Sequence, residues 1–153
     1  MKLATMCYIK KDNKTLMLHR VKKENDIHEG KWVGLGGKIE QGETPEECII
    51  REVNEESGLV IHKPILKGFI TFPGFKNDED WYTFVYTAED FEGELIDSNE
   101  GVLKWVENSK ILSLNMWEGD KLFLEWIESG RMFSGKLVYK NGVLVEESVV
   151  YHT

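Results

Sequence analysis

The sequence has few cysteines and no long apolar run, and each scarcity excludes a class of protein. Its two cysteines, Cys7 and Cys48, cannot build a dense disulfide framework and form no CxxC pair, so we expect a reducing compartment, the cytoplasm. No stretch approaches the ~18 apolar residues of a membrane span, and the first residues turn polar too early for a secretory signal. We therefore expect no membrane partner.

Basic residues are also scarce relative to acidic ones. Nineteen Lys and Arg stand against 27 Asp and Glu, which gives a net charge of −8. Proteins that hold long nucleic acids neutralise phosphates with clustered Lys and Arg, so we expect no stable nucleic-acid partner. A single nucleotide held through metal ions is compatible with this charge.

The length and the uniform composition predict one domain. At roughly 100–200 residues per domain, 153 residues make a single unit that can bury a sizeable core. A hydrophobic fraction of 41% with 30% charged residues is typical of a globular protein. The chain has no repeats and no linker-like run of Pro, Gly or Ser, so we expect residues 1–153 to form one domain.

Hydrophobic periodicity and turn residues predict a mixed α/β (α+β) fold, a sheet sandwiched between helices. Residues 118–128 have the apolar spacing of an amphipathic helix, and residues 21–31 are a polar loop. The glycine-rich segment 32–41 is a strand that bends or is closely approached. β-Branched and aromatic content predicts the other strands at 3–9, 15–19, 60–72, 81–88, 101–106, 132–139 and 143–151, with a turn at 73–80.

The clearest helix runs from Thr44 to Gly58. Thr44 and Glu47 make a Thr-x-x-Glu capping box, and Pro45 suits the first helical position. Gly58 is well placed for a left-handed stop. The helix limits are therefore marked at both ends.

Three carboxylates share one face of this helix. At about 100° per residue, Glu55 and Glu56 lie within about 60° of Glu52. Such like charges repel one another, and two of them lie near the helix C-terminus, where the dipole disfavours anions. A hard cation such as Mg²⁺ or Mn²⁺ relieves both penalties. The alternative is an ordinary solvated acidic face.

The surrounding residues follow the order G-x5-E-x7-R-E-V-x-E-E-x-G-L. This pattern resembles, position for position, the signature of the Nudix hydrolases, with Val53 and Leu59 at its aliphatic positions. Its polar and glycine positions are Gly37, Glu43, Arg51, Glu52, Glu55, Glu56 and Gly58.

The resemblance implies a mixed sheet between helices, with the signature as a loop–helix–loop, and hydrolysis of a nucleoside diphosphate linked to another group. The implied cofactor is Mg²⁺, for which Mn²⁺ can substitute. Arg51 orients Glu52 or Glu56, and Glu43 supports the loop and the helix, with Gly37 and Gly58 as further structural support. One carboxylate, Glu56 or Glu52, is the general base. The implied ligands are Glu52, Glu55, Glu56 and the carbonyl of Gly36.

The resemblance extends to the MutT-like branch, which cleaves oxidised purine nucleoside triphosphates. It implies that Glu100 is a further metal ligand or base, that Trp117 stacks on the base and that Asp120 reads its edge. The alternatives are that Glu100 is an ordinary surface acid, that Trp117 anchors the following helix in the core, and that Asp120 is an acid favoured by the helix dipole. Lys23 and Lys38 are candidates for binding phosphate.

Two positions depart from that branch. Val33 stands where a relative has a base-reading Asn, and Gly119 stands where a relative has an Asp. Val33 can neither donate nor accept a hydrogen bond, so the preference for an oxidised base is less determined than the reaction. The four histidines show no metal spacing, and no role is assigned to them.

We therefore expect a Mg²⁺-dependent pyrophosphohydrolase that converts nucleoside triphosphates, oxidised purine (8-oxo-dGTP-like) nucleotides in particular, to monophosphate and diphosphate. Its partner is a small nucleotide, and the protein is a monomer or homodimer. The alternatives are a diphosphatase for ADP-ribose or dinucleotides, and a non-catalytic nucleotide-sensing module. A sensing module predicts loss of signature residues such as Arg51 or Glu56, and none is lost.

Overall fold

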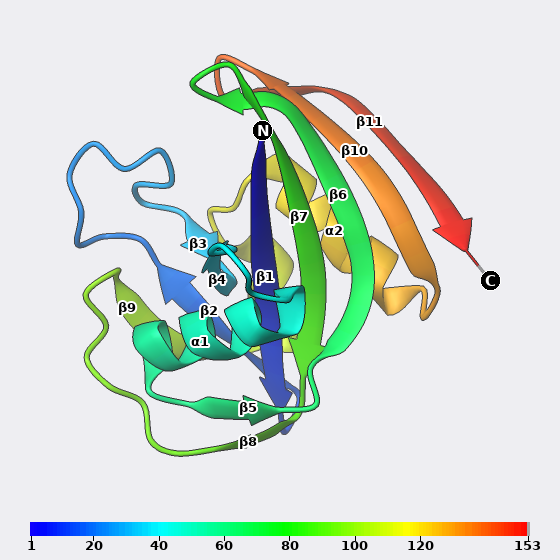
Figure 1. Cartoon of the computed structure of the whole chain (residues 1–153). Helices are drawn as coiled ribbons and strands as arrows, with labels where there is room; N and C mark the ends of the chain where they lie inside the picture. Colours follow the sequence, from blue (N-terminus) through cyan, green and yellow to red (C-terminus); the bar gives the residue numbers. More distant parts are fainter. Residues whose placement is uncertain (153) are drawn as a thin grey trace.

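One mixed sheet contains most of the strands of the protein. The computed structural model describes residues 1–152; Thr153, the last residue of the predicted domain, lies outside them. The elements in chain order are β1 (Lys2–Lys11), β2 (Lys14–His19), β3 (Trp32–Val33), β4 (Leu35–Lys38), α1 (Pro45–Ser57), β5 (Val60–His62), β6 (Ile65–Lys76), β7 (Glu79–Ala88), β8 (Asp90–Glu92), β9 (Val102–Glu107), the 3-10 helix η1 (Asn108–Ser113), α2 (Glu118–Glu128), β10 (Met132–Lys140) and β11 (Val143–His152) (Figure 1).

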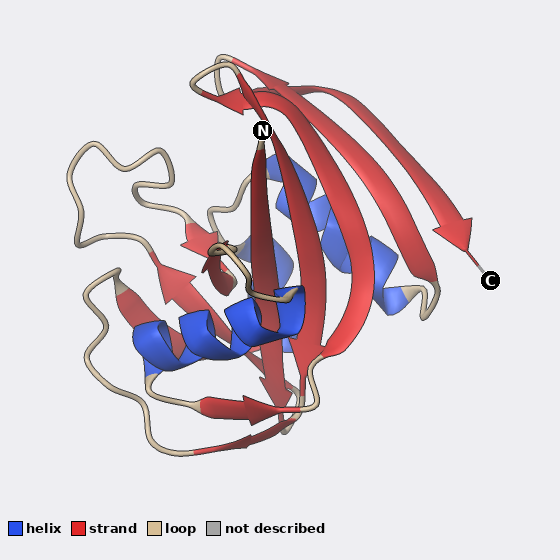
Figure 2. Ribbon diagram, in the orientation of Figure 1, coloured by secondary structure: helices blue, strands red, loops and turns tan. Residues whose placement is uncertain are grey.

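The main sheet has the strand order β11-β10-β6-β7-β1-β2-β3, with β4 paired to β1 and β9 paired to β2. Strand β1 is parallel to β7 and antiparallel to β4 and β2, so the sheet is mixed. Helix α1 lies on one side of this sheet and α2 on the other (Figure 2). The predicted fold class, a mixed sheet between helices, is confirmed. None of the helices within residues 1–152 is long and apolar enough to cross a membrane.

The core has two parts, one on each face of the sheet. Successive side chains of a strand point to opposite faces, and accordingly Cys7 packs in the part beneath α1 while Tyr8 packs in the part beneath α2. Helix α1 contributes Ile49 and Val53 to the first part, each fully buried. Burying such a side chain contributes roughly 1.5–3 kcal/mol. The same packing leaves the carboxylate face of α1 turned away from the core.

The ends of α1 match the sequence prediction. Thr44 Oγ1 accepts a hydrogen bond from the Glu47 backbone N–H, and Glu47 Oε1 accepts one from the Thr44 N–H, so the capping box is complete. Gly58 closes the helix with a φ of 83°, in the left-handed region that favours glycine. The position of every signature side chain along the helix is therefore fixed by local sequence.

The prediction was wrong at residues 60–80. The strand expected over 60–72 is divided into β5 and β6, and the turn expected over 73–80 is mostly strand, because β6 continues to Lys76. The pairing of β6 with β7 shifts register between Phe72 and Lys76, so Pro73 lies at an irregularity of the ladder rather than ending the strand. The true turn is Asn77–Asp78, where both φ angles are positive.

Candidate active site

The candidate site begins where β4 meets α1. Antiparallel pairing with β1 holds Gly36–Lys38 beneath the helix. A Cβ atom on Gly37 would lie 2.5 Å from Cδ of Glu52, so any other residue here would displace that carboxylate from its position. The glycine of the signature is thus explained by a close contact with one of the signature acids.

Glu56 is the most buried acid of the carboxylate cluster on α1. Its side chain is on α1, the residue is 7% exposed, and its Oε1 accepts a hydrogen bond of 2.8 Å from the Gly36 N–H. Burial, together with the charges of Glu52 and Glu100, raises the pKa of Glu56 to about 8 against the opposing effects of the Gly36 bond and the charge of Arg20. Burial, with the charges of Glu55 and Glu100, also raises the pKa of Glu52 against the bond from Arg51. The structure therefore brings Glu52, Glu56 and Glu100 close enough to repel one another.

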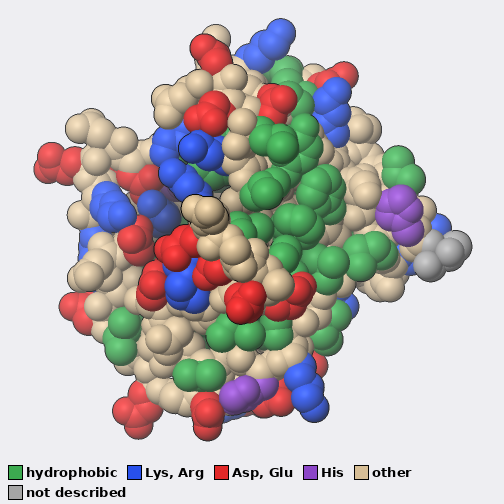
Figure 3. Space-filling view, viewed as in Figure 1, with side chains coloured by type: hydrophobic (Ala, Val, Ile, Leu, Met, Phe, Trp, Pro, Cys, Tyr) green, Lys and Arg blue, Asp and Glu red, His purple; other side chains and the backbone are tan. Residues whose placement is uncertain are grey.

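Arg51 connects this cluster to the loop before the helix. Its Nε and Nη2 donate to the two carboxylate oxygens of Glu43 at 2.6 and 2.9 Å, and its Nη1 donates to Glu52 at 2.8 Å and to Glu55 at 3.3 Å. The Arg51 bonds, with one from the Glu40 N–H, lower the pKa of Glu43 to about 2. Of the two acids that Arg51 was expected to orient, it bonds Glu52 and not Glu56. On the face shown in Figure 3, acidic side chains gather around a few basic ones over α1.

The donor set of the cluster fits a hard divalent cation. Carboxylate oxygens are the ligands that Mg²⁺ and Mn²⁺ prefer, and a cation would relieve the repulsion among Glu52, Glu56 and Glu100, which adds to the effect of burial on the pKa of Glu56. Within residues 1–152 no three His, Cys, Asp or Glu side chains form a ready-made ligand set. The reason is visible in the ion pairs: Arg51 holds Glu52 and Glu55, while basic side chains hold Glu100. A metal-bound arrangement therefore requires these side chains to change partners.

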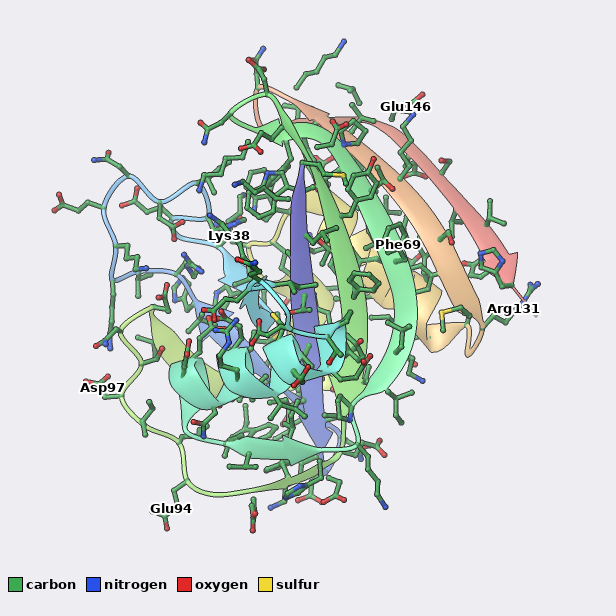
Figure 4. All side chains as sticks on the ribbon, viewed as in Figure 1. Lys38, Phe69, Glu94, Asp97, Arg131 and Glu146 are labelled. Carbon is green, nitrogen blue, oxygen red and sulfur yellow. The ribbon has the colours of Figure 1, made fainter. Side chains whose placement is uncertain are left out.

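Glu100 reaches the cluster from the loop between β8 and β9. Lys23 Nζ lies 2.8 Å from its Oε2, and Arg20 Nη2 lies 3.6 Å from the same oxygen. The neighbouring Lys22 donates to Asp97 and to the Ser98 carbonyl oxygen, both at 2.6 Å. Figure 4 shows Asp97 on this loop at the outer side of α1 and Lys38 above the helix. Two loops that are far apart in sequence are therefore joined beside the carboxylates.

A cavity of about 330 Å³ adjoins this cluster and shares Gly36, Gly37 and Lys38 with it. Lys38 Nζ lies 5.7 Å from the centre of the Trp81 ring on one wall. Trp117, 8% exposed, lines the cavity and packs edge-on against Phe75 and Tyr139. Both interpretations of Trp117 therefore have structural support, because it belongs to the core and also borders the cavity.

Asp120 lines the same cavity as a buried acid. The residue is 5% exposed, and its Oδ2 has no hydrogen-bond partner among the described residues. Burial raises its pKa to about 7, although the charge of Lys31 opposes the shift. Val33 gives the cavity an apolar wall, and the Gly119 N–H donates to the Tyr139 hydroxyl at 2.7 Å. Asp120 is thus an acid of this wall with a buried carboxyl oxygen that no described residue bonds.

Sequence reasoning missed two polar side chains of the cavity. His28 was given no role, yet it lines the cavity and accepts a hydrogen bond from Trp117. Trp81 was treated as a strand residue, yet it lines the cavity and its buried Nε1 has no partner among residues 1–152. Nothing local distinguishes these residues, because His28 lies in a polar loop and Trp81 alternates like any strand aromatic.

Comparisons with known proteins agree with this geometry. The model of the NUDIX domain matches residues 1–127. The Nudix hydrolase YvcI of Bacillus subtilis (strain 168) is 34% identical over 140 residues, covering 88% of this chain and 85% of the relative. The oxidized purine nucleoside triphosphate hydrolase of Danio rerio is 32% identical over 128 residues, covering 83% and 82%. The crystal structure of a MutT protein from Bacillus halodurans superposes with a TM-score of 0.86 at 30% identity, covering 97% of each chain.

Proposed function

Because the chain belongs to the NUDIX family of hydrolases, we propose that it is a Mg²⁺-dependent pyrophosphohydrolase of oxidised purine nucleoside triphosphates. The products are a nucleoside monophosphate and inorganic diphosphate (pyrophosphate). The observation that supports this proposal most strongly is the shared wall of Gly36–Lys38, which joins an aromatic cavity of nucleobase size to a cluster of carboxylates. A nucleotide whose base fills the cavity has its phosphates at the cluster.

In the proposed reaction the carboxylates hold the metal and activate the attacking water. The ligands are Glu52, Glu55, Glu56, Glu100 and the carbonyl of Gly36. When bound, Mg²⁺, or Mn²⁺ in its place, lowers the pKa of water and neutralises charge that develops on the phosphates. Glu56 or Glu52 takes the proton of the water whose oxygen forms the new P–O bond, while the bridging P–O bond between the α- and β-phosphates breaks and releases pyrophosphate.

Several contacts prepare these residues for their roles. The Gly36 N–H fixes one oxygen of Glu56 and leaves the other free. The Arg51 guanidinium orients Glu52 through a charge-assisted bond, and Glu43 in turn fixes Arg51 through a two-bond fork. Arg51 is therefore a positioning residue, since it acts through Glu52. Lys23, which pairs with Glu100 beside the cluster, and Lys38, which lines the cavity, bind the phosphates.

The base is held by Trp117 and Asp120. The Trp117 ring supplies stacking area, and base–aromatic stacking contributes about 1–3 kcal/mol per base. Asp120 supplies the hydrogen-bonding selectivity, because a buried carboxyl with a pKa of about 7 donates when protonated and accepts when ionised. The similarity to the hydrolase of Danio rerio supports an oxidised purine as the preferred base.

We also propose a partner, an oligomeric state and a compartment for the enzyme. Its partner is the small nucleotide itself, and it acts as a monomer or homodimer in the cytoplasm. Both cysteines are free and buried, which is compatible with a reducing compartment.

A product-resolved hydrolysis panel tests the function. The substrates are the ordinary dNTPs and NTPs, 8-oxo-dGTP, 2-oxo-dATP, ADP-ribose and a diadenosine polyphosphate, each with Mg²⁺ and again with excess chelator. We expect chelator-sensitive turnover that is fastest on an oxidised purine triphosphate and releases pyrophosphate. Preference for ADP-ribose or a dinucleotide would assign another substrate class, and the absence of any chelator-sensitive turnover would favour a nucleotide-sensing module.

A further inference from the structure

His28 makes a specific bond to the aromatic wall of the cavity. The Trp117 Nε1–H donates to His28 Nδ1 at 2.8 Å, with the two rings nearly perpendicular at 83°. The ring centre of Phe75 lies 6.3 Å from that of the imidazole, with the two rings at 23°. The histidine therefore contacts two aromatic rings and is bonded to one of them through Nδ1.

The loop that carries His28 is itself tied down. The His28 backbone N–H donates to Asp26 Oδ1 at 3.2 Å, and Asp26 Oδ2 accepts from Arg20 Nε at 2.8 Å. The Gly30 N–H closes the loop by donating to the Arg20 carbonyl oxygen at 2.7 Å. These bonds hold the backbone of residues 26–30 in place, and His28 lines the cavity from this segment.

The bond from Trp117 determines the tautomer of His28. A ring nitrogen that accepts a hydrogen bond carries no proton, so a neutral imidazole must carry its proton on Nε2. Burial, with the nearby charges of Arg20, Lys76 and Lys31, lowers the pKa of His28 to about 4 against the opposing charge of Asp26. His28 is therefore neutral at pH 7, with Nε2–H as its remaining donor.

The same bond also uses the one polar atom of Trp117. With its indole N–H given to His28, Trp117 can offer a ligand only its ring surface, and Val33 offers only methyl groups. An apolar pocket by itself discriminates weakly between related bases, whereas a site that hydrogen-bonds its substrate discriminates strongly. The selectivity of this wall must therefore come from other polar atoms.

We propose that His28 is a positioning and specificity-determining residue, which fixes the Trp117 ring through Nδ1 and donates from Nε2–H to an acceptor atom of the bound nucleobase. The acceptor is a ring nitrogen or a carbonyl oxygen of the base. The proposal rests on the proposed function, because it assumes that a nucleobase occupies the cavity. His28 acts with Asp120, and the two together supply the hydrogen bonds that Val33 cannot.

The first test observes the bond without any ligand. In a ¹⁵N–¹H spectrum the Trp117 indole signal is assigned by its loss in Trp117→Phe. We expect that signal to shift and to exchange faster with solvent in His28→Phe, and to return toward its original position in His28→Asn, whose amide oxygen can accept. The matched control is His62→Phe, which removes an exposed histidine on β5. An indole signal that His28→Phe leaves unchanged would overturn the positioning role.

The second test measures the substrate preference. A hydrogen bond contributes about 1 kcal/mol, so we expect His28→Phe to raise KM for the preferred triphosphate about five- to tenfold and to leave kcat within about twofold. In the Trp117→Phe background the effect of His28→Phe should be smaller than in the wild type, because part of it acts through Trp117. Equal effects in both backgrounds, or an unchanged KM, would contradict the proposal.

A binding measurement separates this proposal from the proposed function. The probe is 8-oxo-dGMP, titrated calorimetrically in the absence of divalent metal, where no hydrolysis occurs. Weaker binding to His28→Phe supports the role of His28 even if the wild type hydrolyses no triphosphate, an outcome that would overturn only the proposed reaction. Equal affinity of His28→Phe and wild type, or no binding by either, would overturn the role of His28.

Discussion

Lys23 and Glu100 form an ion pair beside the carboxylate cluster of α1. Lys23 Nζ lies 2.8 Å from Glu100 Oε2 and 3.0 Å from Oε1, although the lysine was expected to bind phosphate and the acid to bind metal. Arg20 Nη2, 3.6 Å from Oε2, adds a second positive charge. A phosphate that competes for Lys23 weakens its bond to Glu100, and the carboxylate is then available to a cation.

Replacing Lys23 tests this exchange. Lys23→Gln removes a charge-assisted bond to phosphate, so we expect KM for the triphosphate to rise about fivefold, the effect of roughly 1 kcal/mol at a half-exposed site. The measurement is steady-state kinetics with saturating Mg²⁺. The matched control is Lys22→Gln, because Lys22 pairs with Asp97, whose side chain is 95% exposed. Equal effects of the two variants would mean that general surface charge, and not this contact, binds the substrate.

Glu56→Gln tests the carboxylate cluster. The amide keeps an oxygen that can accept from the Gly36 N–H, but it removes the charge that a cation requires. We expect kcat to fall by about 100-fold or more, since a metal ligand and possible base is lost, while the melting temperature does not decrease. Glu125→Gln, an exposed position on α2, is the control and should retain full turnover. Undiminished turnover of Glu56→Gln would contradict the assignment of the metal site.

The parts of the site that follow from local sequence were predictable. The Thr44 cap, the Gly58 stop and the helical period place Glu52, Glu55 and Glu56 on one face without knowledge of the rest of the chain. The sheet between helices followed from alternating strands and two amphipathic helices. Local rules are reliable here because each of these features depends on residues within about one helical turn of one another.

The contacts between distant residues were not predictable. His28 and Trp117 are 89 positions apart, and Lys23 and Glu100 are 77 apart, so no local pattern indicates that either pair meets. The sequence around Pro73 is misleading for another reason. Proline normally ends a strand, but the register shift in the β6–β7 ladder accommodates it, and only the partner strand reveals the shift.

Arg51→Lys tests the positioning of Glu52. An ammonium cannot keep a two-bond fork to Glu43 and a third bond to Glu52 at the same time, so we expect kcat to fall about tenfold with little change in KM. Combining it with Glu43→Gln should cost less than the product of the two single effects, because both changes disrupt one network. Arg131→Lys, above the Tyr151 ring, is the control. Multiplicative effects of Arg51→Lys and Glu43→Gln would show that the two residues act independently.

Asp120 makes stability depend on pH. Its pKa is about 7 in the folded protein and about 3.9 in an unfolded chain, so between these values the folded state binds more protons. The stability that Asp120 contributes is thus fully present below about pH 4 and is lost as the pH rises to about 7, where the buried carboxylate ionises. We expect the stability advantage of Asp120→Asn over the wild type to grow by roughly 2–3 kcal/mol between pH 5 and pH 8, in denaturant unfolding monitored at both pH values. The control is Asp90→Asn, an exposed acid on β8, which should follow the wild type at both. If the stability of Asp120→Asn equals that of the wild type at both pH values, burial does not raise the pKa of Asp120. The proposal that Asp120 can donate a hydrogen bond to a base at neutral pH would then be wrong.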